Sequence, residues 1–349
     1  TDYFNTKLYT GNGSTNAISS VGHQPDLVWL KERSSAGAGL LFDAVRGATK
    51  FVRSSDNAAE VTAADTLTAF NSDGFTLGAD AGNYAANQNS ETYASWNWKA
   101  GGGQGSSNTD GSINTTYTSV NTTAGFSICQ WTGTEANATI GHGLGVAPSM
   151  IIIKNTEKAT SWVVYHKSLG ATKALYLEST GSASTSAVFF NNTEPTSSVF
   201  SVGTNDGANG NGEKNIAYCF AEKTGYSKFG SYVGNGNADG SFIYTGFKPA
   251  FVMFKRSDGG TENWALLDST RSYANVANHT LAANSSNAES SFGGGESVFG
   301  ASNKVDILSN GIKIREASNY NNTSGATYIY MCFASAPLVG SNNVPCTAR

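Results

Sequence analysis

A short sequence pattern occurs three times in this chain of 349 residues. In each copy a glycine precedes a proline by three residues, a lysine follows that proline by six, and an apolar run lies between them. The copies contain Gly22, Pro25 and Lys31, then Gly145, Pro148 and Lys154, and finally Gly246, Pro249 and Lys255. Repetition at fixed spacing is typical of chains built from related structural units. We therefore expect three related domains rather than one large enzyme fold.

The segments around these patterns predict β-structure. Each apolar run, such as LVWL at residues 27–30, is too short to favour a helix, so it predicts a strand buried on both faces. Each copy opens on an aromatic residue followed by a glycine turn and closes on an alternating aromatic strand, such as TYASWNWK from Thr92. With about six to eight short strands per copy, the expected fold is all-β: three tandem antiparallel β-sandwich domains of jelly-roll-like type.

The predicted domains cover residues 1–99, 126–223 and 224–349, and the third includes a C-terminal tail. Residues 100–125 are rich in Gly, Ser, Asn and Thr, which predicts a linker that can still add an edge strand. The second and third copies nearly abut. We expect these two domains to have the more defined relative orientation.

Composition argues against several classes of partner. The net charge is −4 and no run of Lys or Arg occurs, so we expect no nucleic-acid partner. No apolar stretch approaches the roughly 18 residues of a membrane span, and the first residues lack a signal-peptide pattern, so we expect a soluble chain without membrane insertion. Cys219 and Cys332 occupy matching positions in two copies, which predicts free thiols; Cys129 lies on a predicted strand and Cys346 in the tail.

Two sets of charged residues recur between copies. The repeated lysines have two interpretations, either cations that bind a ligand or strand-end lysines that extend into solvent, and we favour the second. Asp43 with Arg46, and Asp268 with Arg271, have the same spacing in the first and third copies, whereas the second has His166 and Leu169. A structural ion pair or interface contact is favoured over catalysis, because no nucleophile or second titratable partner recurs nearby.

No catalytic residue, metal or cofactor is predicted. The four histidines lack metal-binding spacing, and the acidic loops at residues 72–83 and 203–215 lack the ligand pattern of an EF-hand, so we expect surface turns there. Tryptophan side chains can stack on sugar rings, but the matching positions of Trp162 and Trp264 favour core packing.

Longer segments carry a resemblance that spans essentially the whole chain. These segments are YTGNGSTNAISSVGHQPDLVWLK, LFDAVRGATK, FNSDGFTLG, ASWNWKAGGG, AYCFAE, GYSKFGSYVGNG and APLVGSNNVPCTAR. Together they resemble a triple-repeat β-domain family of tailed bacteriophages, especially phages of marine bacteria. The resemblance implies a virion protein, either a tail fibre, a tail-associated protein or a capsid decoration, assembled in the host cytoplasm and located on the virion surface. It brings no catalytic residues.

Three functions follow as hypotheses. The first is a non-enzymatic virion structural protein that contacts other virion proteins and presents loops for host attachment. The second is a carbohydrate-binding module for host surface glycans, and the third is a depolymerase of such glycans, which requires paired carboxylates across a cleft. A homo-oligomer is expected, with a trimer as one form; alternatively, the three copies form a pseudo-threefold unit within one chain.

Overall fold

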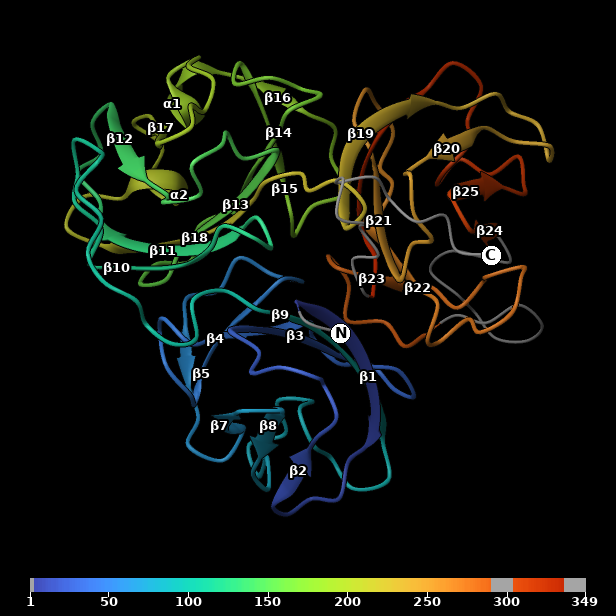
Figure 1. The fold of residues 1–349 in the computed structure, drawn as a ribbon, viewed down its shortest axis with the longest axis horizontal. Coiled ribbons are helices and arrows are strands. Elements are labelled where there is room, and N and C mark those ends of the chain that lie inside the picture. Colours follow the sequence, from blue (N-terminus) through green and yellow to red (C-terminus); the bar gives the residue numbers. More distant parts are fainter. Residues whose placement is uncertain (1–2, 290–303, 336–349) are drawn as a thin grey trace.

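The computed structural model describes residues 3–289 and 304–335, and these residues form an almost entirely β fold (Figure 1). Residues 336–349, which contain Cys346 and the predicted tail, lie outside the described residues, as do residues 1–2 and 290–303. All the pairings between named strands are antiparallel, as expected for sandwich domains. None of the helices within the described residues has the length and apolar character needed to cross a membrane.

Three lobes follow one another along the chain. The first lobe consists of β1 (Phe4–Thr10), β2 (Asn16–Ile18), β3 (Leu27–Glu32), β4 (Leu40–Asp43), β5 (Lys50–Arg53), β6 (Val61–Thr62), β7 (Leu67–Asn71), β8 (Gly74–Leu77) and β9 (Thr92–Trp98). The second lobe consists of β10 (Tyr117–Asn121), β11 (Phe126–Thr132), β12 (Ala138–Gly141), β13 (Met150–Asn155), β14 (Val163–His166), β15 (Lys173–Tyr176), β16 (Ser184–Thr185), α1 (Ala187–Phe190), β17 (Val199–Val202), α2 (Asp206–Asn209) and β18 (Lys214–Phe220). The third lobe consists of β19 (Ser227–Val233), β20 (Phe242–Tyr244), β21 (Phe251–Arg256), β22 (Ala265–Asp268), β23 (Leu281–Ala282), β24 (Val305–Leu308), β25 (Gly311–Ile314) and β26 (Thr327–Phe333).

The same strand order recurs in the main sheet of each lobe. It is β1-β9-β3-β4-β5 in the first lobe, β11-β18-β13-β14-β15 in the second and β19-β26-β21-β22-β23 in the third. A small second sheet packs against each main sheet, formed by β2-β8-β7, β12-β17 and β20-β25-β24 respectively. Because one face of each main sheet is covered by the small sheet, each lobe has a sandwich core of its own.

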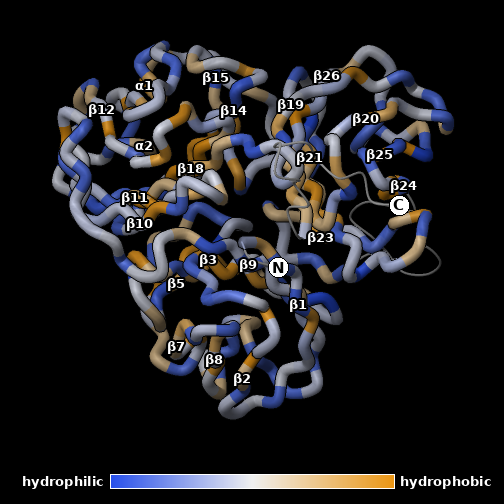
Figure 2. The backbone as a smooth tube through the Cα atoms, in the orientation of Figure 1, coloured by the Kyte–Doolittle hydropathy of each residue, from blue (hydrophilic) through white to orange (hydrophobic). Residues whose placement is uncertain are grey.

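The other face of each main sheet points to the centre of the molecule, where the three lobes share one hydrophobic core (Figure 2). In β3, Leu27 and Trp29 enter this central core, whereas Val28 and Leu30 enter the core of the first lobe. The strands β13 and β21 divide their side chains in the same way. The prediction of strands buried on both faces is therefore confirmed, with period-two alternation separating two cores.

Three equivalent aromatic residues meet at the middle of the central core. Trp98, Phe220 and Phe333 end the strands β9, β18 and β26, and they pair with equivalent residues of β3, β13 and β21. The ring centroids lie 6.1 Å apart for Trp98 and Phe220, 5.6 Å for Trp98 and Phe333, and 5.8 Å for Phe220 and Phe333. These edge-to-face contacts form a triangle at the place where the three lobes meet.

Equivalent backbone hydrogen bonds close the ring of lobes at its three junctions. The amide of Glu60 donates to the carbonyl of Thr156 at 2.8 Å, and the amide of Ala183 donates to the carbonyl of Ser257 at 3.0 Å. The amide of Glu289 returns to the first lobe, where it donates to the carbonyl of Arg33 at 2.8 Å. A defined orientation was expected mainly between the second and third lobes, but the first lobe is fixed to both of its neighbours as well.

The predicted linker is partly held by the first lobe. The buried Asp26 carboxylate accepts hydrogen bonds from the amides of Ala100, Gly102 and Gly103, at 2.7, 3.0 and 2.9 Å. Further along, β10 pairs with β11 and forms an edge of the second main sheet. The low-complexity composition of residues 100–125 therefore includes a fixed turn and an edge strand.

A buried asparagine fixes the turn after the first long strand in every lobe. Asn87, Asn209 and Asn322 each lie five residues before the strand that closes the lobe. The Nδ2 atom of Asn322 donates to the Asn235 side chain at 3.0 Å and to the carbonyls of Asn237 and Glu316 at 2.7 and 2.8 Å. Asn87 makes the equivalent contacts in the first lobe. Each amide thereby satisfies acceptors from two separate loops.

Candidate functional site

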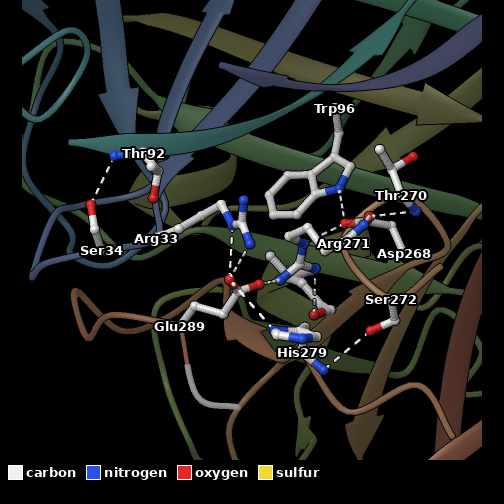
Figure 3. Close-up of polar contacts among 11 residues, drawn as sticks. Arg33, Ser34, Thr92, Trp96, Asp268, Thr270, Arg271, Ser272, His279 and Glu289 are labelled. Atoms are coloured by element: carbon white, nitrogen blue, oxygen red, sulfur yellow. Dashed lines mark hydrogen bonds and ion pairs between the residues drawn. The ribbon is translucent and has the colours of Figure 1, made fainter. Parts of the chain in front are cut away.

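The junction between the third and first lobes contains a buried network of charges (Figure 3). Arg271 follows β22 and its Nε atom lies 2.5 Å from the Asp268 carboxylate; neither side chain is exposed. The Nη1 atom of Arg271 donates to Glu289 at 2.9 Å, and Arg33 of the first lobe binds the same carboxylate at 2.7 Å. Burial alone would lower the pKa of Arg271, but the carboxylates of Asp268 and Glu289 raise it.

Trp96 of the first lobe completes this network. Its indole Nε1 donates to Asp268 Oδ2 at 3.0 Å, and its ring lies 5.3 Å from the guanidinium carbon of Arg271 (Figure 3). A planar cation beside an indole gains a cation–π attraction in addition to its ion pairs. The network therefore joins two lobes through bonds that are fully buried at Asp268 and partly buried at Glu289.

The junction between the first and second lobes repeats this arrangement. Arg46 Nε lies 2.5 Å from Asp43, and Arg46 Nη1 lies 3.2 Å from Glu60. The hydroxyl of Tyr218, from the second lobe, donates to Asp43 Oδ2 at 2.8 Å. Tyr218 and Trp96 occupy equivalent positions of β18 and β9, because each pairs with the third residue of its central partner strand. The structural ion pairs and interface contacts favoured from the sequence are present at both junctions.

The junction between the second and third lobes has none of these charged groups. His166 replaces the aspartate, Leu169 the arginine, and Ala183 the glutamate, while Met331 occupies the position of Tyr218. The Nδ1 atom of His166 accepts a hydrogen bond from the amide of Ser168 at 3.1 Å. Its Nε2 lies 3.2 Å from the carbonyl of Tyr330, which can only accept, so Nε2 carries the proton. Burial lowers the pKa of His166 to about 4, and the ring is neutral.

The four positions therefore change together among the three junctions. Two junctions have a carboxylate, a guanidinium, a second carboxylate and an aromatic donor, and the third has neutral residues at all four positions. A buried cation without its carboxylates, or the reverse, is strongly unfavourable, so the residues act as one set. These residues hold neighbouring lobes in place.

Tryptophan provides a second kind of contact between lobes. Trp162 Nε1 of the second lobe donates to the carbonyl of Arg53 in the first at 2.9 Å, and Trp264 Nε1 of the third lobe donates to the carbonyl of Tyr176 in the second at 3.0 Å. Gly39 occupies the equivalent position of the first lobe. All six tryptophans are buried, so the core-packing interpretation is correct and none is a surface platform for a sugar.

The repeated lysines do not extend into solvent, and that part of the sequence interpretation is wrong. Lys31, Lys154 and Lys255 are completely buried. Lys154 Nζ donates to the carbonyls of Asn155, Lys158 and Thr160, at 2.8, 3.1 and 2.9 Å. Lys255 Nζ donates to two carbonyls, one of them from Thr180 in the second lobe, and Lys31 Nζ donates to the carbonyl of Gly37. The loop that follows each strand folds back, and at least one of its carbonyls accepts a hydrogen bond from the ammonium group.

Burial is the main influence on the acidity of these lysines. It lowers the pKa of Lys31 to about 7 and those of Lys154 and Lys255 to about 8. A carboxylate also interacts with each ammonium group, Glu32 in the first case, and partly opposes this shift. The lysines act as structural donors within loops.

The repeated glycines and prolines define the entry into the central strands. Gly22, Gly145 and Gly246 have φ values of 88°, 72° and 84°, a conformation that side chains disfavour. Pro25, Pro148 and Pro249 are buried two residues before β3, β13 and β21. The spacing of the pattern thus reflects a turn followed by a strand.

The carboxylates of the two acidic loops already have partners within the protein. In the loop at residues 203–215, Lys158 Nζ lies 3.4 Å from Asp206 and 2.6 Å from Glu213. In the loop at residues 72–83, the carboxylates accept hydrogen bonds from backbone amides. Asp73 accepts from the amides of Ser20 and Gly22 at 3.1 and 2.6 Å, and Asp80 accepts from the amides of Tyr84 and Ala86. Within residues 3–289 and 304–335, no group of three or more His, Cys, Asp or Glu side chains is arranged to hold a metal ion. Cys129, Cys219 and Cys332 are buried free thiols, as expected for the last two.

Comparison with known proteins places the chain in a family. Residues 1–337 match the model of a domain of unknown function, DUF7483. The chain belongs to this family. No curated protein and no solved structure matches the chain. The DUF7483 match includes all three lobes, so the ring of lobes falls within one family unit.

Proposed function

We propose that this chain is a non-enzymatic structural protein on the surface of a tailed-phage virion, either as a capsid decoration or as part of a tail fibre. The observation that supports this proposal best is the closed ring of three lobes around Trp98, Phe220 and Phe333. A single chain in this form is a preassembled block with three similar outward faces. The sequence resemblance to phage proteins supports a location on the virion.

Stability outside a cell is a requirement for a virion surface protein. The buried charged groups of the junctions are occupied in holding lobes together, and the backbone groups of the main sheets are paired in ladders. Such a block can bind neighbouring virion proteins on one side and present loops for host attachment on the other. A pseudo-threefold block suits a site of threefold symmetry with one copy of the chain.

Labelling of particles tests the proposal. An antibody against this chain, viewed on negatively stained virions, is expected to mark either the capsid faces or the tail fibres, and the position distinguishes the two roles. Particles from a phage with the gene deleted provide the control. Absence of label from every intact particle, with label only in the lysate, overturns the proposal.

A further inference from the structure

A cavity of about 920 Å³ opens between the first and third lobes. Its wall is formed by the loop after β3, the loop before β9, the turn after β5 and residues 284–286 of the third lobe. This volume falls within the usual range of small-ligand sites. We propose that this cavity binds a saccharide that is neutral or carries an amine.

The wall offers an aromatic ring together with free polar groups. Tyr84 is half-buried, and its ring packs edge-to-face on Phe51 at a centroid distance of 5.2 Å, which fixes its orientation. Among the described residues, no hydrogen bond is made by the hydroxyl of Tyr84 or by the side chains of Asn83 and Asn89. A fixed ring beside amides and hydroxyls matches a sugar, which has apolar C–H faces and polar edges.

The loop that carries these groups is held rigidly. The buried carboxylate of Asp80 accepts hydrogen bonds from the amides of Tyr84 and Ala86 and from the Gln88 side chain, at 3.0, 2.8 and 2.9 Å. Four non-glycine residues of this loop have positive φ: Asp80 (51°), Asn83 (54°), Ala85 (67°) and Ser90 (68°). Such conformations persist only where the surroundings impose them. A loop fixed before binding loses little freedom when a ligand arrives.

Charge restricts the class of sugar. Three carboxylates line the cavity, those of Glu32, Asp56 and Glu91, against one guanidinium, that of Arg53. Arg53 and Asp56 form an ion pair at 3.0 Å, and the buried Lys31 ammonium group interacts with Glu32, so among the described residues Glu91 is the wall carboxylate without an ion-pair partner. An anionic ligand such as a uronic or sialic acid would be repelled, whereas a neutral or amino sugar would not.

The cavity lies at the junction where the inter-lobe tryptophan is absent. The wall loop reads Ser-Ala-Gly-Ala-Gly at residues 35–39, and Gly39 replaces the indoles that span the other two junctions. Residues 35–38 line the cavity with small side chains, and Gly39 follows them without lining it. The first lobe thus differs from the others in the segment beside the cavity.

Binding of sugars by the purified full chain tests the inference in the absence of virions. The result is therefore independent of whether the proposed virion location is correct. A panel of neutral, amino and acidic di- to tetrasaccharides is screened by ligand-observed NMR, and hits are titrated by calorimetry. We expect neutral or amino sugars to bind and acidic ones to be rejected. Tyr84→Ala is expected to weaken binding at least about tenfold, since the aromatic surface against which the C–H face of the sugar packs is lost. Tyr244→Ala, at an exposed tyrosine of the third lobe, is the control and leaves binding unchanged.

Two further results decide the inference. Glu91→Gln is expected to raise the affinity for acidic sugars relative to neutral ones, and an unchanged ratio contradicts the role of charge. Thermal melting of each variant establishes that the fold is retained. Failure of every neutral and amino sugar to bind, or equal binding by the Tyr84→Ala variant with an intact fold, overturns the inference.

Discussion

Arg271 and Leu169 occupy equivalent positions in two junctions, yet one is charged and the other apolar. Their neighbours explain the difference: Arg271 has two carboxylates, and Leu169 has His166 and Ala183 at the same places. The identity of each residue is matched to its neighbours within the set. Substitution of one residue of the set should therefore lower the free energy of unfolding more than replacement of the whole set does.

Arg271→Leu is expected to lower the free energy of unfolding by about 3–5 kcal/mol, because Asp268 and Glu289 remain buried without their shared cation. Asp268→His, Arg271→Leu and Glu289→Ala combined introduce three of the four residues found at the junction between the second and third lobes, and this variant should be less damaging than Arg271→Leu alone. Urea unfolding of both variants measures the difference. Arg53→Leu, at a half-exposed ion pair, is the control and should change stability by less than about 1 kcal/mol. A triple variant as unstable as the sum of its parts would contradict the coupling.

The buried lysines predict a dependence of stability on pH. Burial lowers the pKa of Lys31 to about 7 in the folded chain, below the value of about 10.4 in the unfolded chain. Between these values the unfolded chain binds more protons, so stability should rise with pH by up to about 1.4 kcal/mol per pH unit for this lysine. Urea unfolding at intervals from pH 6 to 10 measures the slope. Lys31→Met should reduce it, and Lys173→Met, at an exposed lysine, should not; equal slopes in both would refute the prediction.

At the scale of elements, the sequence predicted strands and contacts between residues close along the chain, but it missed contacts between residues far apart in the sequence. The Gly-x-x-Pro pattern located β3, β13 and β21, and the three-residue spacing paired Asp43 with Arg46. Tyr218 could not be assigned to Asp43 because 175 residues separate them.

The lysines show the same limit. They were expected in solvent because a strand end is often exposed, but carbonyls of the following loop enclose them, and the sequence contains no signal for that fold-back. Asn87, Asn209 and Asn322, here called the clamp asparagines, each lie five residues before the closing strand of a lobe. This constant distance is a sequence signal, but it can be recognised only once the strand ends are known.

Loss of a clamp asparagine should destabilise one lobe locally. Asn322→Ala removes four side-chain hydrogen bonds and leaves buried acceptors without donors, so we expect a loss of about 2–4 kcal/mol. Hydrogen exchange should accelerate first in the turn after β19 and in the loop before β26. Asn57→Ala, at an exposed position of the first lobe, provides the control. Uniform acceleration over all three lobes would argue against a local clamp.

At the scale of the whole molecule, the shared core couples the lobes. Met150, Ile152 and Phe220 of the second lobe contact the central core rather than their own sandwich core, and the other lobes contribute equivalent residues. Separation of one lobe would expose this entire face to water. The lobes should therefore fold as one unit.

Calorimetry tests this coupling. A single unfolding transition is expected, with the van't Hoff and calorimetric enthalpies in agreement, and light scattering should give a mass near 36.4 kDa for a ring complete within one chain. The isolated second lobe should associate or precipitate because its central face is apolar. Three separate transitions, or a well-behaved monomeric lobe, would contradict a common core.

The aromatic triangle of Trp98, Phe220 and Phe333 has a consequence for how the protein can diversify. In a trimer of identical subunits every mutation is present three times, so a change that benefits one boundary is imposed on all. Fusion of the three units in one gene removes that constraint. The junction between the second and third lobes can then lack charged residues, and the junction between the first and third lobes can contain a cavity, while the remaining contacts hold the three lobes together.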